Sequence, residues 1–171
     1  MKNAFIRNKN TLKCNIIISA FFILLCLSDY SLSQVKIPRL NNPPQIYGSV
    51  TESSWQYAAM ITGFLQREPD EGEPMTEKTE VFICYDKDKI YFGIKCYQDP
   101  QSIAAKAMQR GASLPHDDRV HIILDTYLDG RNAYFFEINP LGAVGDMVIS
   151  QGGRKRNKSW DGNIRIFHPF L

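Results

Sequence analysis

The sequence predicts an all-β fold, an antiparallel β-sandwich of the jelly-roll kind, for the chain that follows its first 33 residues. Three observations lead to this prediction. Short segments with period-two alternation recur, loops containing Gly, Pro or Asp separate them, and no long segment has helical periodicity. The 171 residues suffice for one domain, and a net charge of +2 is too balanced to indicate a nucleic-acid partner.

Residues 1–33 have the pattern of a secretory signal peptide. A basic start precedes an apolar segment at 15–27, whose 13 residues fall short of the ~20 that a spanning helix needs. Ser31 and Ser33 place small residues where a cleavage site requires them. We therefore expect export to the periplasm, outer membrane or cell surface, and a mature domain over residues 34–171. An uncleaved anchor is the alternative.

The clearest alternating pattern is a hairpin between Asp117 and Asp146. Residues 119–124 and 133–138 both alternate, and an Asp-Gly pair at 129–130 lies in the turn between them. A second hairpin is expected to join residues 79–85 to residues 90–97.

The second hairpin also determines how its two cysteines are interpreted. Its register places Cys84 opposite Tyr91 and far from Cys96, so we expect no disulfide and treat both cysteines as small buried hydrophobes. The residues expected to be mostly buried in the core are Val81, Ile83, Tyr85, Tyr91, Val120, Ile122, Leu124, Phe136 and Ile138.

The remaining segments give weaker patterns. We expect a helical turn that carries Trp55 into the core, and a long loop at 66–78, since loops of that length often line a site or cover an edge. Further strands are expected at residues 61–65, 103–110, 147–150 and 164–167, with a solvated basic loop at 154–158. Residues 103–110 have helical propensity, but their neighbours favour a strand.

Carboxylates gather at the ends of the central hairpin. Calcium takes ~6–8 oxygen ligands, mainly from carboxylates, amides and backbone carbonyls. A structural calcium ion is therefore one interpretation, and the capping of loops is the other. The carboxylates expected to hold the ion are Asp118, Asp125, Asp129 and Asp146.

A series of short motifs follows the same order along the chain. The motifs are Pro43-Pro44-x-Ile46-x-Gly48-x-x-x-Glu52-x-x-Trp55, Thr79-Glu80-Val81, Tyr85-Asp86, Ile90-Tyr91-x-Gly93, Asp117-Asp118-x-Val120, Leu124-Asp125-Thr126, Asp129, Phe136-x-Ile138-Asn139-Pro140-x-Gly142, Asp146 and Trp160-Asp161. Together they resemble family 9 carbohydrate-binding modules of the DOMON-like β-sandwich group. The resemblance is closest to a version that opens exported Bacteroidetes-type proteins, ahead of a domain resembling an outer-membrane β-barrel.

Two departures from that family concern its binding site. Tyr47 stands where the family usually has Asp, and Gln109-Arg110-Gly111 stands where an Arg-Arg-Asp run is common. The resemblance also implies that the chain ends, at Leu171, before the last strands of the sandwich and before the barrel-like domain.

The resemblance implies a non-catalytic carbohydrate-binding module of an exported protein associated with polysaccharide breakdown. Binding a glycan requires aromatic faces for the sugar rings and planar polar side chains for the hydroxyls. The side chains expected to contact the glycan are Arg110, Trp160, Tyr97, Tyr134, Glu77 and Asn139. For Arg110 the alternative is a surface pair with Asp117, and for Trp160 it is a core anchor.

No pattern of catalytic residues stands out. The three histidines have no metal-ligand spacing, and no nucleophile motif or organic cofactor is expected. One alternative function is a structural domain docked to an outer-membrane β-barrel, with a decayed sugar site. The other is haem binding, as in some DOMON-like domains, through residues such as Met108 and His116.

Overall fold

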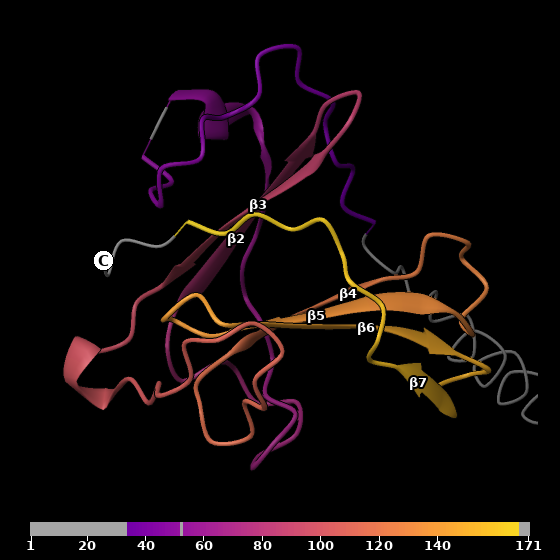
Figure 1. The fold of residues 1–171 in the computed structure, drawn as a ribbon. Coiled ribbons are helices and arrows are strands. Elements are labelled where there is room, and N and C mark those ends of the chain that lie inside the picture. The colour runs from indigo at the N-terminus through magenta and orange to yellow at the C-terminus, as the bar shows by residue number, and fades with distance from the viewer. Residues whose placement is uncertain (1–33, 52, 168–171) are drawn as a thin grey trace, which may run out of the picture. The chain divides into compact units, whose positions relative to one another are not determined.

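The structure is a computed structural model and describes residues 34–51 and 53–167. Strands predominate among these residues and form two antiparallel sheets, which confirms the all-β prediction (Figure 1). The helical elements in this part of the chain are two short 3-10 helices, η1 (Ser53–Tyr57) and η2 (Pro100–Ser102). No helix in these two ranges has the length and apolar character to cross a membrane. The predicted signal peptide lies outside the described residues.

The first sheet has the strand order β1-β2-β3. β1 (Ala59–Ile61) begins and ends earlier than the strand expected at 61–65, whereas β2 (Thr79–Tyr85) and β3 (Ile90–Cys96) form the expected hairpin. Cys84 lies opposite Tyr91 as predicted and is buried. The predicted burial of Cys96 is wrong, because this residue is exposed at the open end of the hairpin, where β3 ends.

Trp55 is buried on this sheet, as expected. Its ring meets Phe82 edge-on, with centroids 6.4 Å apart. The indole also lies over Gly93, where a methyl group would come within 3.0 Å of the ring and 2.5 Å of Val50. The sequence has glycine at 93 because any larger residue would occupy the space of the indole.

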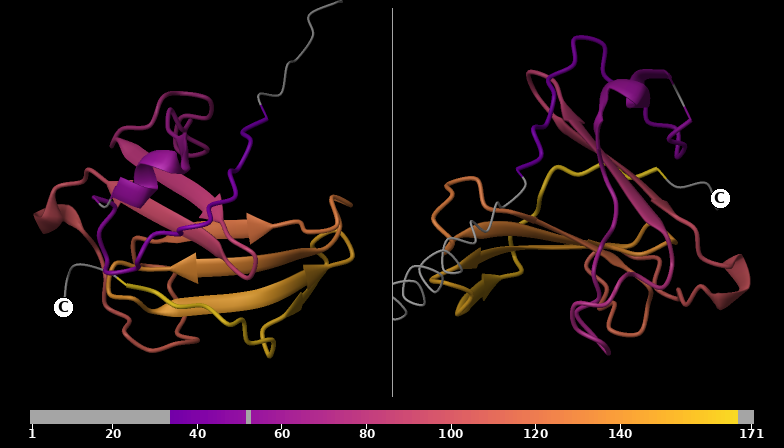
Figure 2. Two further views of the ribbon diagram at one scale, coloured as in Figure 1. Left: turned by 90° about the horizontal axis from the view of Figure 1, so that it is seen from above. Right: turned by 180° about the vertical axis from the view of Figure 1, so that it is seen from behind.

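The second sheet has the strand order β4-β5-β6-β7, and the two views of Figure 2 show its strands side by side. β4 (Val120–Leu124) and β5 (Ala133–Ile138) form the predicted central hairpin. β6 (Val144–Ser150) starts before the expected residue 147. The basic segment is exposed but is not a loop, because Lys155–Asn157 forms β7 after a turn through Gly152 and Gly153 at positive φ.

The predicted core is largely confirmed. Eight of the nine side chains are partly buried, with most of their surface covered and none completely enclosed. Tyr85 is 38% exposed, so its predicted burial is wrong, since it ends β2 beside the turn to β3. The buried hydrophobic residues all lie outside this set: Trp55, Cys84, Leu114, Ala143 and Val144.

The strands predicted at 103–110 and 164–167 are absent from the described residues. In the first segment, the amide of Ala104 donates to Asp118, and the amides of Lys106 and Ala107 donate to Asp117. Carboxylates therefore satisfy this backbone in place of a neighbouring strand. The segment leads to Arg110, and the next amide, that of Gly111, donates to the carbonyl of Val144 on β6 at 2.7 Å.

Candidate functional site

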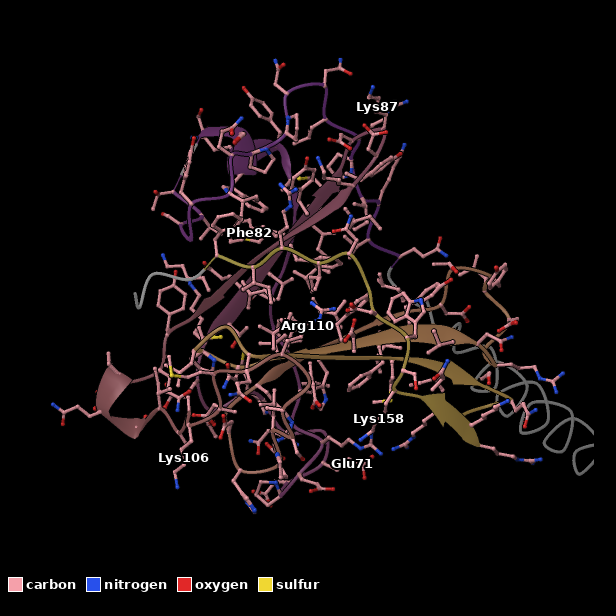
Figure 3. All side chains as sticks on the ribbon, viewed as in Figure 1. Glu71, Phe82, Lys87, Lys106, Arg110 and Lys158 are labelled. Carbon is pink, nitrogen blue, oxygen red and sulfur yellow. The ribbon has the colours of Figure 1, made fainter. Side chains whose placement is uncertain are left out.

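Arg110 is bonded to the loop that carries Trp160. Its guanidinium donates to Asp146 Oδ2 at 2.7 Å and to the carbonyl of Gly162 at 2.9 Å, and it also pairs with Asp161. Figure 3 labels Arg110 among the side chains of the fold. The amide of Gly162 donates to the same Asp146 oxygen at 2.6 Å. The alternative of a pair with Asp117 is wrong. Asp146, on β6, instead holds both Arg110 and the loop.

Trp160 and Tyr134 lie against each other on the second sheet. Their ring centroids are 5.0 Å apart, and the Trp160 ring meets Phe136 edge-on at 5.8 Å. Trp160 is partly buried, and a methyl group at Gly162 would lie 2.8 Å from its ring. These contacts are those of a core anchor, which is the alternative that the sequence allowed for Trp160.

Asn139 is buried and uses its whole side chain inside the protein. Its amide nitrogen donates to the carbonyl of Ala107 at 2.7 Å and to Asp117 at 2.8 Å, while its oxygen accepts from the amides of Leu141 and Ala143. The amides of Ala107 and Lys106, followed by the side chain of Asn139, hold the pKa of Asp117 below its ordinary value of 3.8. Asn139 thus connects the turn after β5 to two distant segments.

Tyr97 is exposed, but charged side chains surround its ring. The ammonium groups of Lys78 and Lys95 lie 4.8 and 4.7 Å from the ring centroid. The phenol donates to Glu80 at 2.9 Å, and Lys78 pairs with the same carboxylate at 2.6 Å. Hydrogen bonds from Lys78 and then Tyr97 lower the pKa of Glu80 from its ordinary value of 4.5.

Glu77 lies in a separate open pocket of about 410 Å³. Most of its walls come from the long loop at 66–78, and Leu65 and Gln98 complete them. The pocket contains the carboxylates of Glu68 and Glu77 and no aromatic side chain. The six predicted ligand contacts are therefore distributed over several places. The internal contacts described above involve Arg110, Trp160, Asn139, Tyr134 and Tyr97.

The four predicted calcium ligands do not form one cluster. Asp118 precedes β4 and Asp125 follows it, which separates them by roughly 20 Å along an extended strand. Asp125 and Asp129 share the β4–β5 turn, where both accept backbone amides. Within residues 34–51 and 53–167, no three His, Cys, Asp or Glu residues are grouped as metal ligands would be. Each of the four carboxylates accepts backbone amides from a loop.

Sequence reasoning missed a second open pocket, of about 450 Å³. Its walls comprise Leu40, Asn41, Asn42, Ser53, Ser54 and Tyr57. The ring of Tyr57 is on the surface, with 70% of the residue exposed. The two amides and two hydroxyls make no hydrogen bond with another described residue. We call this set of residues the Tyr57 pocket.

The Tyr57 pocket depends on a contact between distant segments. The lead-in chain pairs in parallel with the end of β2, where the amide of Leu40 donates to Tyr85 at 2.8 Å. This places Asn41 and Asn42 beside η1. The sequence signal was weak, since it consisted of an Asn-Asn pair and a Ser-Ser pair in segments expected to be surface chain and a helical turn.

Comparison with known proteins assigns no family to the chain. No protein-family model, curated protein or solved structure matched it. The candidate site is therefore defined by the residues and contacts described above.

Proposed function

We propose that this chain is a non-catalytic carbohydrate-binding module of an exported protein that takes part in polysaccharide breakdown. We also propose that its two antiparallel sheets form a jelly-roll-like β-sandwich. The observation that carries the proposal is the Tyr57 pocket, where an exposed aromatic ring lies among four uncharged polar side chains. The order of the motifs that resemble family 9 modules supports the same function.

The chemistry of the Tyr57 pocket suits a sugar. The carbon-bound hydrogens of a pyranose favour an aromatic face, and its hydroxyls both donate and accept hydrogen bonds. Asn41 and Asn42 offer amides with both capacities, and the two serine hydroxyls add more. A small set of such groups beside an apolar surface is typical of ligand pockets.

The predicted site around Arg110 and Trp160 is less suited to this role. A ligand that used Arg110 would have to replace its bonds to Asp146 and Gly162. A ligand that used Asn139 would leave buried partners without hydrogen bonds, which costs about 1–3 kcal/mol for each group. The Tyr57 pocket requires no such exchange with a described residue.

The test is retention on polysaccharide affinity gels and on a glycan array, using the exported protein. Tyr57→Ala should lower affinity for a retained glycan by about tenfold or more, the loss expected for a stacked ring. Tyr127→Ala is the matched control, because Tyr127 is equally exposed, at 73% against 70%, and lies in the β4–β5 turn. Loss of binding in Arg110→Ala, with Tyr57→Ala unchanged, would return the site to Arg110.

A second candidate function is a structural domain docked to an outer-membrane β-barrel, with a decayed sugar site. The internal bonding of Arg110, Trp160 and Asn139 favours it, because these side chains stabilise the fold as they stand. This candidate predicts that no glycan is retained by the unaltered protein or by any variant, while Arg110→Ala still lowers the melting temperature.

Either function requires export, and we propose cleavage after Ser33. N-terminal sequencing of the exported protein should begin at Gln34. A sequence that begins at Met1, or a lipid on Cys26, would contradict this.

A further inference from the structure

The β4–β5 turn presents two apolar side chains to solvent. Tyr127 is 73% exposed and Leu128 is 92% exposed. Leu128 has a φ of 53°, in the left-handed region where the Cβ of a leucine is crowded by its own backbone. Glycine or asparagine usually occupies such a position in a hairpin turn. The turn could therefore close without Leu128, and its exposed leucine side chain points to another role.

The turn is held in this conformation by two carboxylates. Asp125 accepts the amides of Tyr127, Asp129 and Gly130, the last at 2.7 Å. Asp129 accepts the amides of Arg131 and Asn132 at 2.7 and 2.8 Å. These bonds fix the backbone on both sides of Leu128, so the side chain projects from a rigid tip. Strained positions that a local network maintains are concentrated at functional sites.

A basic surface surrounds the tip. The amide of Gly152 donates to the carbonyl of Arg131 at 2.9 Å, which joins the β6–β7 turn to the β4–β5 turn. The pairing of Ser150 with Lys155 places β7 at the same end of the sheet, as Figures 1 and 2 show. The exposed cations at this end are Arg131, Arg154, Lys155 and Arg156, and none forms an ion pair with a described residue.

We propose that this end of the second sheet docks on the surface of an anionic phospholipid bilayer. Leu128 enters the acyl boundary, and Tyr127 lies at the headgroup level, where tyrosine is favoured. The cations contact the anionic headgroups, each adding attraction that salt screens. The charge of the surface argues for this partner. Among the described residues of the two turns and β7, four cations without an ion pair stand beside two carboxylates, Asp125 and Asp129, that already accept backbone amides. The inference goes beyond carbohydrate binding and uses other residues.

The experiment is co-sedimentation of the exported protein with vesicles of phosphatidylcholine alone, or of phosphatidylcholine mixed with phosphatidylglycerol. Binding should favour the anionic vesicles and fall as salt increases. Leu128→Gly should lower the affinity for anionic vesicles by about tenfold, because most of the free energy gained by burying one leucine side chain is lost. Its fold should be retained, because glycine adopts the left-handed conformation without strain.

Two further variants separate the contributions. Replacing Arg154 and Arg156 together by glutamate should abolish the preference for anionic vesicles. Ile90→Ala, which removes an exposed apolar side chain at the start of β3 in the other sheet, should bind as the unaltered protein does. All samples should begin at the same residue, so that any N-terminal apolar segment contributes equally.

Three results would overturn the proposal. The first is no binding to anionic vesicles, and the second is equal binding by Leu128→Gly. The third is lipid-free self-association that Leu128→Gly abolishes, which would assign the tip to a second copy of the chain.

Discussion

Replacing Gly93 by alanine should lower the free energy of unfolding, because the methyl group has no space. It would lie 2.5 Å from Val50 Cγ1 and 3.0 Å from two carbons of the Trp55 ring. Carbon atoms are in favourable contact at about 3.5–4.0 Å. Trp55 is only 4% exposed and is packed against Phe82, so the indole has little freedom to move.

The expected magnitude combines two opposing effects. Overpacking a core costs typically about 1–3 kcal/mol, and contacts this short place Gly93→Ala in the upper part of that range. Alanine also reduces the freedom of the unfolded chain, which returns about 0.4–1 kcal/mol. The net loss of stability should therefore be about 1–2 kcal/mol.

Gly145→Ala is the matched control, since Gly145 is also a buried strand glycine. Its added methyl group would meet the side chain of Glu137, with Oε1 at 2.7 Å and Cγ at 2.8 Å. This side chain is flexible, and its contacts with Arg119 and His121, at 3.7 and 3.6 Å, are partly exposed and contribute little. The small cost of shifting Glu137 opposes the gain of about 0.4–1 kcal/mol from a less free unfolded chain, so the free energy of unfolding should change by less than about 0.5 kcal/mol.

Urea unfolding followed by tryptophan fluorescence measures both variants, provided that the transition is two-state. If Gly145→Ala lost as much stability as Gly93→Ala, the freedom of the neighbouring side chain, Glu137 or Trp55, would not determine how much stability the added methyl group removes. An unchanged Gly93→Ala would show that the indole moves freely.

Four other changes give distinct results. Phe136→Ala should cost about 2–3 kcal/mol in urea unfolding, below the value for a fully enclosed ring because Phe136 is only partly buried. The lowered pKa of Asp117 means that folding favours its charged form. The stability that it contributes is present above its ordinary pKa of 3.8 and is lost as the pH falls through its folded pKa. Asp117→Asn should flatten this acid dependence of the free energy of unfolding. Burial, followed by the bond to Asp86, raises the pKa of Tyr91 from 10.0 to about 12. The stability that Tyr91 contributes is therefore present below pH 10 and is lost as the pH rises towards about 12. In a titration followed by tyrosinate absorbance, Tyr91→Phe should lack the step near pH 12. Calcium at millimolar concentration should raise the melting temperature relative to chelator, because an ion bound only to the folded state stabilises it. Asp118→Ala should remove the shift, and no shift in the unaltered protein would leave the carboxylates as loop caps.

Elements fixed by local patterns were predictable from the sequence. The β2–β3 hairpin follows from alternation on either side of a turn in which Asp86 accepts the amides of Asp88 and Lys89. The β4–β5 hairpin and the burial of Trp55 followed in the same way. In the two hairpins, the signal and the contacts that it predicts lie within one continuous segment of the chain.

Elements that depend on distant partners were not predictable. Nothing within residues 103–110 shows that Asp117 and Asp118 would satisfy their amides, so the strands expected on either side led to the prediction of a strand here. The strand β7 was obscured by its basic composition, although the Gly-Gly pair before it marks the turn. The Tyr57 pocket was missed because it requires the lead-in chain to pair with Tyr85.

The position of Asn139 has a consequence for chemical ageing. Asparagine deamidates when the backbone nitrogen of the next residue attacks its side-chain amide, and the product at Asn139 would be a carboxylate. That carboxylate would face Asp117, which the amide nitrogen now approaches at 2.8 Å, and it could no longer donate to Ala107. The next residue is Pro140, whose ring nitrogen carries no hydrogen and is a poor nucleophile for this attack. The buried amide that joins three segments of the fold is thereby protected from the modification that would set two negative charges against each other.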